Sequence, residues 1–191
     1  MYPTTKTRFE AFSDGVFAIA ITLLALELHV PTLLSTSIEG GIIELLPLVP
    51  NILTFVLSFF AIAIFWVNHH QLTQTMGPLQ RRILWTNVAF LLFITLIPFG
   101  TKVVSTNPDH SLAIMTYALI LFAGSVAFTT LRYYVHRSCG EGVIPVKRSL
   151  VGPVVYGLAV VAAAFFIPLS YMLLAIPPLF YFLPKARLQA A

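Results

Sequence analysis

The side chains that could take part in chemistry lie at the start of one apolar run and at the end of the next. These two groups are Arg8, Phe12, Ser13 and Asp14 in the first run, and Trp66, His69 and His70 in the second. Polar groups inside lipid are costly and require a partner or a role, and a carboxylate near cationic side chains can stay ionised. We therefore expect a structural polar network that locks the first run to the second and third, made of Arg8, Ser13, Asp14, His69 and His70 with Arg81 and Arg82 before the third run. Asn87 and Tyr156 are further candidates for interhelical hydrogen bonds.

Enzymatic, metal and cofactor chemistry are not expected from these residues. His69 and His70 are adjacent, so on a helix they point about 100° apart and cannot chelate one ion together. The sequence has no His-x-x-x-His or Glu-x-x-His pair, no phosphate-binding Walker loop, no Gly-x-Ser-x-Gly elbow and no Thr-Val-Gly-Tyr-Gly filter. Its single cysteine, Cys139, excludes an intrachain disulfide. A membrane-embedded metal or redox protein using the two histidines remains an alternative that bound metal or visible absorbance would reveal.

Composition places the chain in a membrane. The 191 residues are 58% hydrophobic and 9% charged, whereas soluble domains carry roughly 25% charged residues. Mean hydropathy is +0.90. The net charge of +4 arises from basic residues in short groups between apolar runs, not in one stripe, so nucleic acid is not an expected partner.

The apolar runs predict an all-α, polytopic membrane protein with a single domain over residues 1–191. A spanning helix needs about 20 apolar residues, and six runs qualify or nearly do so: 8–30, 48–70, 82–104, 111–135, 149–167 and 169–184. Pro168, between the last two, could instead kink one longer helix. The segment from Pro31 to Pro47 is the longest predicted outer loop and could hold a short interfacial stretch.

The basic residues predict the orientation. With both termini in the cytoplasm, ten of the eleven Lys and Arg residues lie inside, and only Lys102 lies outside. The ten are Lys6, Arg8, Arg81, Arg82, Arg132, Arg137, Lys147, Arg148, Lys185 and Arg187. Positive charge concentrates on the cytoplasmic side of membrane proteins, which favours six spans in the cell membrane.

The first run carries two stripes at helical spacing. One stripe holds large apolar side chains, namely Phe12, Ile19, Leu23, Leu26 and Val30. The other holds small side chains, namely Ala11, Gly15, Ala18, Thr22 and Ala25. In one interpretation the small stripe packs closely on a neighbouring helix and the large stripe faces lipid or core. In the other, several copies of this helix surround an axis, and the large side chains form a hydrophobic constriction that gates by dewetting.

Two motifs resemble a known family. Arg8-x-x-x-Phe12-Ser13-Asp14 runs into a Gly-Val-Phe-Ala-Ile-Ala-Ile-Thr-Leu-Leu segment at 15–24, and Trp66-x-x-His69-His70 ends the second run. Both resemble the transmembrane protein 175 family of potassium channels, in its short prokaryotic branch with one six-helix repeat per chain.

The resemblance implies a homotetramer whose central pore is lined by the first helix. Ile19, Leu23 and Leu26 would form hydrophobic rings, and Thr22 would form a polar layer linked to selectivity. Arg8, Ser13 and Asp14 would join Trp66 and either His69 or His70 in a network that holds the pore helix.

These observations together predict a potassium-permeable cation channel in the lipid bilayer, with proton permeation through the same pore as a variant. A proton- or ion-coupled secondary transporter is the alternative. Transporters often show inverted repeats and helices broken at the membrane midplane, and the sequence shows neither.

Overall fold

The computed structural model describes residues 5–28, 31–138 and 150–182, and every regular element in them is helical. The elements are α1 (Lys6–Leu26), α2 (Ile38–Leu45), the 3₁₀ turn η1 (Leu46–Leu48), α3 (Val49–Gln74), α4 (Arg81–Thr106), α5 (Ser111–Ser138), α7 (Val151–Phe165) and α8 (Ile167–Phe182). The predicted all-α class is confirmed.

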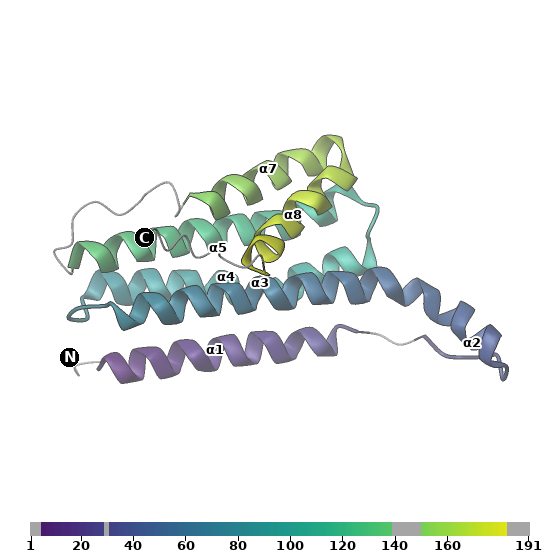
Figure 1. Cartoon of the computed structure of the whole chain (residues 1–191), viewed down its shortest axis with the longest axis horizontal. Coiled ribbons are helices and arrows are strands. Elements are labelled where there is room, and N and C mark those ends of the chain that lie inside the picture. Colours follow the sequence, from purple (N-terminus) through teal and green to yellow (C-terminus); the bar gives the residue numbers. More distant parts are fainter. Residues whose placement is uncertain (1–4, 29–30, 139–149, 183–191) are drawn as a thin grey trace, which may run out of the picture.

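The helices form a bundle in which α1 lies at one edge (Figure 1). Helix α1 packs chiefly against α3 and α4, and α4 continues the bundle through α5 to α7 and α8. The short helix α2 projects beyond the end of the bundle, next to the connection from α1. It buries none of its residues, although Ile38, Ile42 and Ile43 are apolar. The segment predicted as the longest outer loop therefore contains a short helix.

In the described part of the chain, four helical stretches are long and apolar enough to cross a bilayer, namely α1, the continuous stretch Ile38–Gln74, α4 and α5. The bounds of α1, α3, α4 and α5 lie within four residues of the predicted runs at 8–30, 48–70, 82–104 and 111–135, whereas the continuous stretch Ile38–Gln74 begins ten residues earlier than predicted. Lys185 and Arg187, on which the predicted side of the C-terminus depends, lie outside the described residues.

The last two helices are shorter than the four long spans: α7 is shorter than its predicted run at 149–167, and α8 has the short length expected from 169–184. Helices α7 and α8 contain 15 and 16 residues, so at 1.5 Å per residue each is roughly 23 Å long, less than the roughly 30 Å hydrocarbon core. Extended backbone at Phe166 separates them, with φ −153° and ψ 93°. Pro168 lies in the first turn of α8, where a missing N–H costs little. The break at this proline is thus a true helix boundary and not a kink.

The bundle core is centred on Phe90 of α4, which is fully buried. Its ring lies 5.9 Å from that of Phe17 on α1, 5.6 Å from that of Phe65 on α3 and 5.2 Å from that of Phe128 on α5. Tilted aromatic pairs at such separations stabilise beyond their buried area. One side chain therefore joins four helices and fixes the face that α1 turns inward.

Candidate functional site

Helix α1 divides into a buried face and an exposed face. The buried residues are Phe9, Ser13, Phe17, Ala20 and Leu24. The large stripe is exposed, with fractions of 59% for Phe12, 61% for Ile19, 42% for Leu23 and 73% for Leu26. The large stripe therefore does not face the core of its own chain. Val30 lies outside the described residues.

The small stripe is exposed as well. Ala11, Gly15, Ala18, Thr22 and Ala25 all lie on the outer side of α1, and a Cβ atom added to Gly15 would meet nothing within 4 Å. Within the chain, α1 thus packs on α3 and α4 through a third face, and not through the small stripe as the first interpretation required. The hydroxyl of Thr22 donates to the Ile19 carbonyl at 2.9 Å, which leaves its oxygen lone pairs directed outward.

A buried polar network fixes the inner end of α1. Asn87 Nδ2 of α4 donates to Ser13 Oγ at 2.9 Å, and Ser13 Oγ donates to the Phe9 carbonyl at 2.9 Å. The other amide atom, Asn87 Oδ1, lies 2.8 Å from His69 Nε2 of α3. Because the amide oxygen only accepts, Nε2 carries a proton in this arrangement. All three side chains are at most 1% exposed, so α1, α3 and α4 are joined at one point.

Aromatic rings hold His69 in place. The imidazole stacks on Phe9 at 6.0 Å and on Phe90 at 5.9 Å, with interplanar angles of 20° and 15°. His70 is exposed and stacks instead on Trp66 at 5.7 Å. The structure therefore places His69, and not His70, next to Asn87 and Ser13.

Asp14 belongs to a second, exposed contact. Trp66 Nε1 donates to Asp14 Oδ1 at 2.9 Å, on the same side of the bundle as the Trp66–His70 stack. Arg8 joins neither group, because its side chain is exposed and makes no ion pair within the described residues. The expected single network is thus two separate clusters, one buried around Asn87 and one exposed around Trp66.

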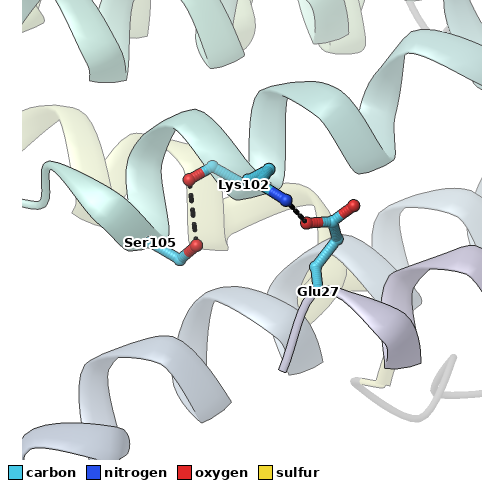
Figure 2. A network of polar contacts seen from close by, with 3 residues as sticks. All are labelled: Glu27, Lys102 and Ser105. Atoms are coloured by element: carbon cyan, nitrogen blue, oxygen red, sulfur yellow. Dashed lines mark hydrogen bonds and ion pairs between the residues drawn. The ribbon is translucent and has the colours of Figure 1, made fainter. Parts of the chain in front are cut away.

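The outer end of α1 is held by an ion pair that sequence reasoning missed. Glu27, the C-cap of α1, lies with Oε2 3.0 Å from Lys102 Nζ of α4 (Figure 2). Lys102 is the one basic residue that the predicted topology places outside, and pairing explains how it is accommodated. A carboxylate at a helix C-terminus opposes the helix dipole, and the ammonium compensates for this as well.

A third contact lies among α3, α4 and α5. Thr101 Oγ1 donates to Ser58 Oγ at 2.7 Å, and Ser58 Oγ lies 2.9 Å from the Tyr117 hydroxyl. All three residues are buried. The two helices against which α1 packs, α3 and α4, are therefore joined to each other by a hydrogen bond, and α3 is also joined to α5.

Comparison with known proteins identifies this arrangement. The family model described as endosomal/lysosomal potassium channel TMEM175 matches residues 8–98. A protein named potassium channel from Chryseobacterium sp. (strain P1-3) is 38% identical over 72% of this chain and 68% of its own length. Another potassium channel, from Chamaesiphon minutus, is 39% identical over 65% of this chain and 63% of its own length.

A solved structure extends the likeness to the whole fold. The crystal structure described as a lysosomal potassium-selective channel TMEM175 homolog from Chamaesiphon minutus superposes with a TM-score of 0.78 at 31% identity, covering 92% of this chain and 95% of that one. The chain belongs to the TMEM175 family. It is therefore a multi-pass membrane protein of a channel family and not an enzyme, as predicted.

The matched TMEM175 segment contains most of the site. Residues 8–98 include all of the exposed stripe on α1, both polar clusters and α4 as far as Pro98. Lys102 of the outer ion pair lies beyond the matched segment. Within the described residues, no three His, Cys, Asp or Glu side chains converge as metal ligands would.

Proposed function

We propose that this chain is a potassium-permeable cation channel of the cell membrane, in which four copies surround a pore lined by α1 and both termini face the cytoplasm. The observation that carries the proposal is the outward face of α1. A single chain leaves this apolar helix face uncovered, although the opposite face of α1 is packed against α3 and α4. Potassium is proposed as the permeant ion because the chain is similar to bacterial relatives that are named potassium channels.

The exposed stripe suits a hydrophobic gate. Ile19, Leu23 and Leu26 occupy successive turns of one face, so four copies would place three apolar rings along the axis. Narrow apolar constrictions exclude water and ions until they widen or wet. No carbonyl filter of the Thr-Val-Gly-Tyr-Gly type exists in the sequence, so the rings and the helix rotation would set the barrier.

Thr22 supplies the polar layer of the proposed pore. Its hydroxyl proton is used by the Ile19 carbonyl, so the oxygen presents only lone pairs to the outward side. Four such oxygens could replace part of the hydration shell of a passing cation and would repel no positive charge. This is the basis on which we assign cation selectivity to Thr22.

The polar clusters would position the pore helix. Ser13 and Asn87 fix the inner end of α1 to α4, and Glu27 and Lys102 fix its outer end to the same helix. Rotation of α1 requires one of these attachments to yield. The buried inner attachment is the stronger one, because charged pairs near water are screened, so we assign opening movements to the outer half of α1.

The proposal is tested by flux from potassium-loaded liposomes that contain the purified chain, with sodium outside and a proton-sensitive dye reporting charge balance. We expect rapid potassium-driven quenching, which Leu23→Ala and Leu26→Ala increase by removing the apolar rings. The matched control is Leu119→Ala, since Leu119 is a leucine on α5 whose exposure of 55% lies between the 42% of Leu23 and the 73% of Leu26.

Each outcome decides a separate point. Equal flux in Leu26→Ala and Leu119→Ala would exclude an apolar gate on α1. Slow, saturable flux without unitary currents would indicate a coupled transporter. Quenching driven by a proton gradient without potassium would show that protons use the same pore.

A further inference from the structure

A polar cavity lies at the end of the bundle where α4 begins and α5 ends. It has a volume of about 160 Å³ and is lined by Gln80, Arg82, Tyr134, Arg137 and Ser138. By the same measure a single water needs roughly 10–15 Å³, so the cavity has room for several waters or for one small polar group. None of these residues belongs to the proposed pore or to its polar clusters.

The cavity wall is strongly basic. Two of its five residues are arginines, and none of the five is acidic. The Arg82 side chain is exposed and makes no hydrogen bond within the described residues. Arg137 Nη1 donates to the Tyr133 hydroxyl at 2.9 Å, but a guanidinium has five N–H donors. Most of the donor capacity around the cavity is therefore available to a ligand.

The two helix ends at the cavity carry opposite partial charges. Gln80 is the N-cap of α4 and forms no side-chain cap hydrogen bond, so the first N–H groups of a 26-residue helix face this end. The C-terminus of α5 contributes the opposite partial charge, roughly half an elementary charge. Two full guanidinium charges exceed that term. The net field in the cavity attracts an anion.

The surrounding aromatic residues set the depth of the cavity in the membrane. Trp85 is 63% exposed one turn into α4, and Tyr133 is 46% exposed in the last turns of α5. Trp and Tyr concentrate at the level of the lipid head groups. Basic pockets between spanning helices at this depth bind the phosphates of anionic lipids.

We propose that this cavity binds a phosphate group, supplied by an anionic phospholipid head group or by a soluble phosphate compound. Arginine presents a planar fork that matches two phosphate oxygens at once, and Arg82 and Arg137 approach the cavity from two different helices. Tyr134 and Ser138 add neutral polar atoms to the same wall. Binding here would join the start of α4 to the end of α5 independently of ion conduction.

The experiment uses the purified, delipidated full chain in detergent. Native mass spectrometry compares the numbers of phosphatidylglycerol and phosphatidylcholine molecules bound per chain, and calorimetry measures the binding of inorganic phosphate. The variants are Arg82→Gln and Arg137→Gln, and the control is Arg81→Gln, which removes the same charge from an adjacent exposed residue outside the cavity. Size-exclusion profiles and melting temperatures verify folding, and either arginine variant suffices if the other does not fold.

We expect phosphatidylglycerol to bind in preference to phosphatidylcholine, with about tenfold weaker binding in each cavity variant and little change in Arg81→Gln, since a charged hydrogen bond contributes on the order of a factor of ten. Arg82→Lys, which keeps the charge and loses the fork, should fall between. Phosphate binding with the same dependence, without lipid preference, would assign the site to soluble phosphates. Equal effects of Arg81→Gln and Arg82→Gln, or no binding of either probe, would overturn the proposal.

Discussion

Replacing Asn87 with alanine tests the inner attachment of α1 most directly. Asn87 is 1% exposed and is the only residue that contacts both Ser13 of α1 and His69 of α3 through hydrogen bonds in the described part of the chain. Alanine removes both interhelical bonds and leaves the buried Nε2–H of His69 without its acceptor. Ser13 keeps its bond to the Phe9 carbonyl, so it is affected less.

The magnitude follows from these contacts. Hydrogen bonds between helices in membranes contribute on average about 0.6 kcal/mol each, which gives about 1.2 kcal/mol for two. A buried donor left unsatisfied costs about 1–3 kcal/mol more. We therefore expect Asn87→Ala to lower the free energy of unfolding by about 2–4 kcal/mol. At roughly 2–4 °C per kcal/mol for a chain of this size, the apparent melting temperature falls by about 4–16 °C.

The assay is thermal unfolding in detergent, followed by loss of the folded size-exclusion peak. The control is Asn107→Ala, since Asn107 is an exposed asparagine at the end of the same helix whose amide bonds only to the local Val103 carbonyl. If the two variants melt within about 2 °C of each other, the network around Asn87 does not hold α1 and the reasoning is refuted.

Three further predictions concern other contacts. Lys102→Glu should shift the ratio of open to closed channels by about 1.4- to 5-fold, because a partly exposed ion pair contributes about 0.2–1 kcal/mol. The double variant that exchanges the two residues, Glu27→Lys with Lys102→Glu, should restore the open probability measured in single-channel recordings. If it does not, the pair does not act as a unit. Asp14→Asn should assemble like the parent chain in cross-linking assays, because the asparagine keeps an acceptor for Trp66. Asp14→Ala lacks that acceptor and should assemble less well, without a change in potassium preference. Changed ion selectivity in either variant would place Asp14 in the conduction path. Gly100→Ala should lower the melting temperature relative to Gly41→Ala, because overpacking costs about 1–3 kcal/mol. The new Cβ would lie 2.9 Å from Ile120 Cδ1 and 3.1 Å from Tyr117 Cδ2, whereas a Cβ at Gly41 would meet open space. Equal melting temperatures would show that α5 moves aside freely.

The fold could be predicted from the sequence because lipid imposes simple requirements. Apolar runs of sufficient length predicted α1, α3, α4 and α5, and Pro168 marked the boundary between α7 and α8. The helical stretch before α3 was not predicted, because the segment from Pro31 to Pro47 was interpreted as an outer loop. Pro47 and Pro50 do not interrupt this stretch. Both prolines lie in the first turn of a helical segment, where proline is tolerated.

The site was predicted only in part. The helical wheel grouped the large residues of α1 correctly on one face, but it could not decide whether that face was inward or outward. The burial of Phe17 against Phe90 decides it. His69 and His70 have equal chemistry, and only the rotation of α3 buries one of them. The partners Ser13 and Asn87, 74 residues apart, depend on the rotation of two helices that no local pattern specifies.

The bond between Ser13 and Asn87 also has a consequence for biosynthesis. Ser13 leaves the ribosome 74 residues before its partner, which corresponds to a delay of about 4–15 s at 5–20 residues per second. During that interval α4 is not yet available to α1, and α3 is complete only for the last part of it. The bond from Ser13 Oγ to the Phe9 carbonyl of the same helix satisfies the hydroxyl proton throughout, so we expect the newly made helix to enter the bilayer before its permanent partner exists.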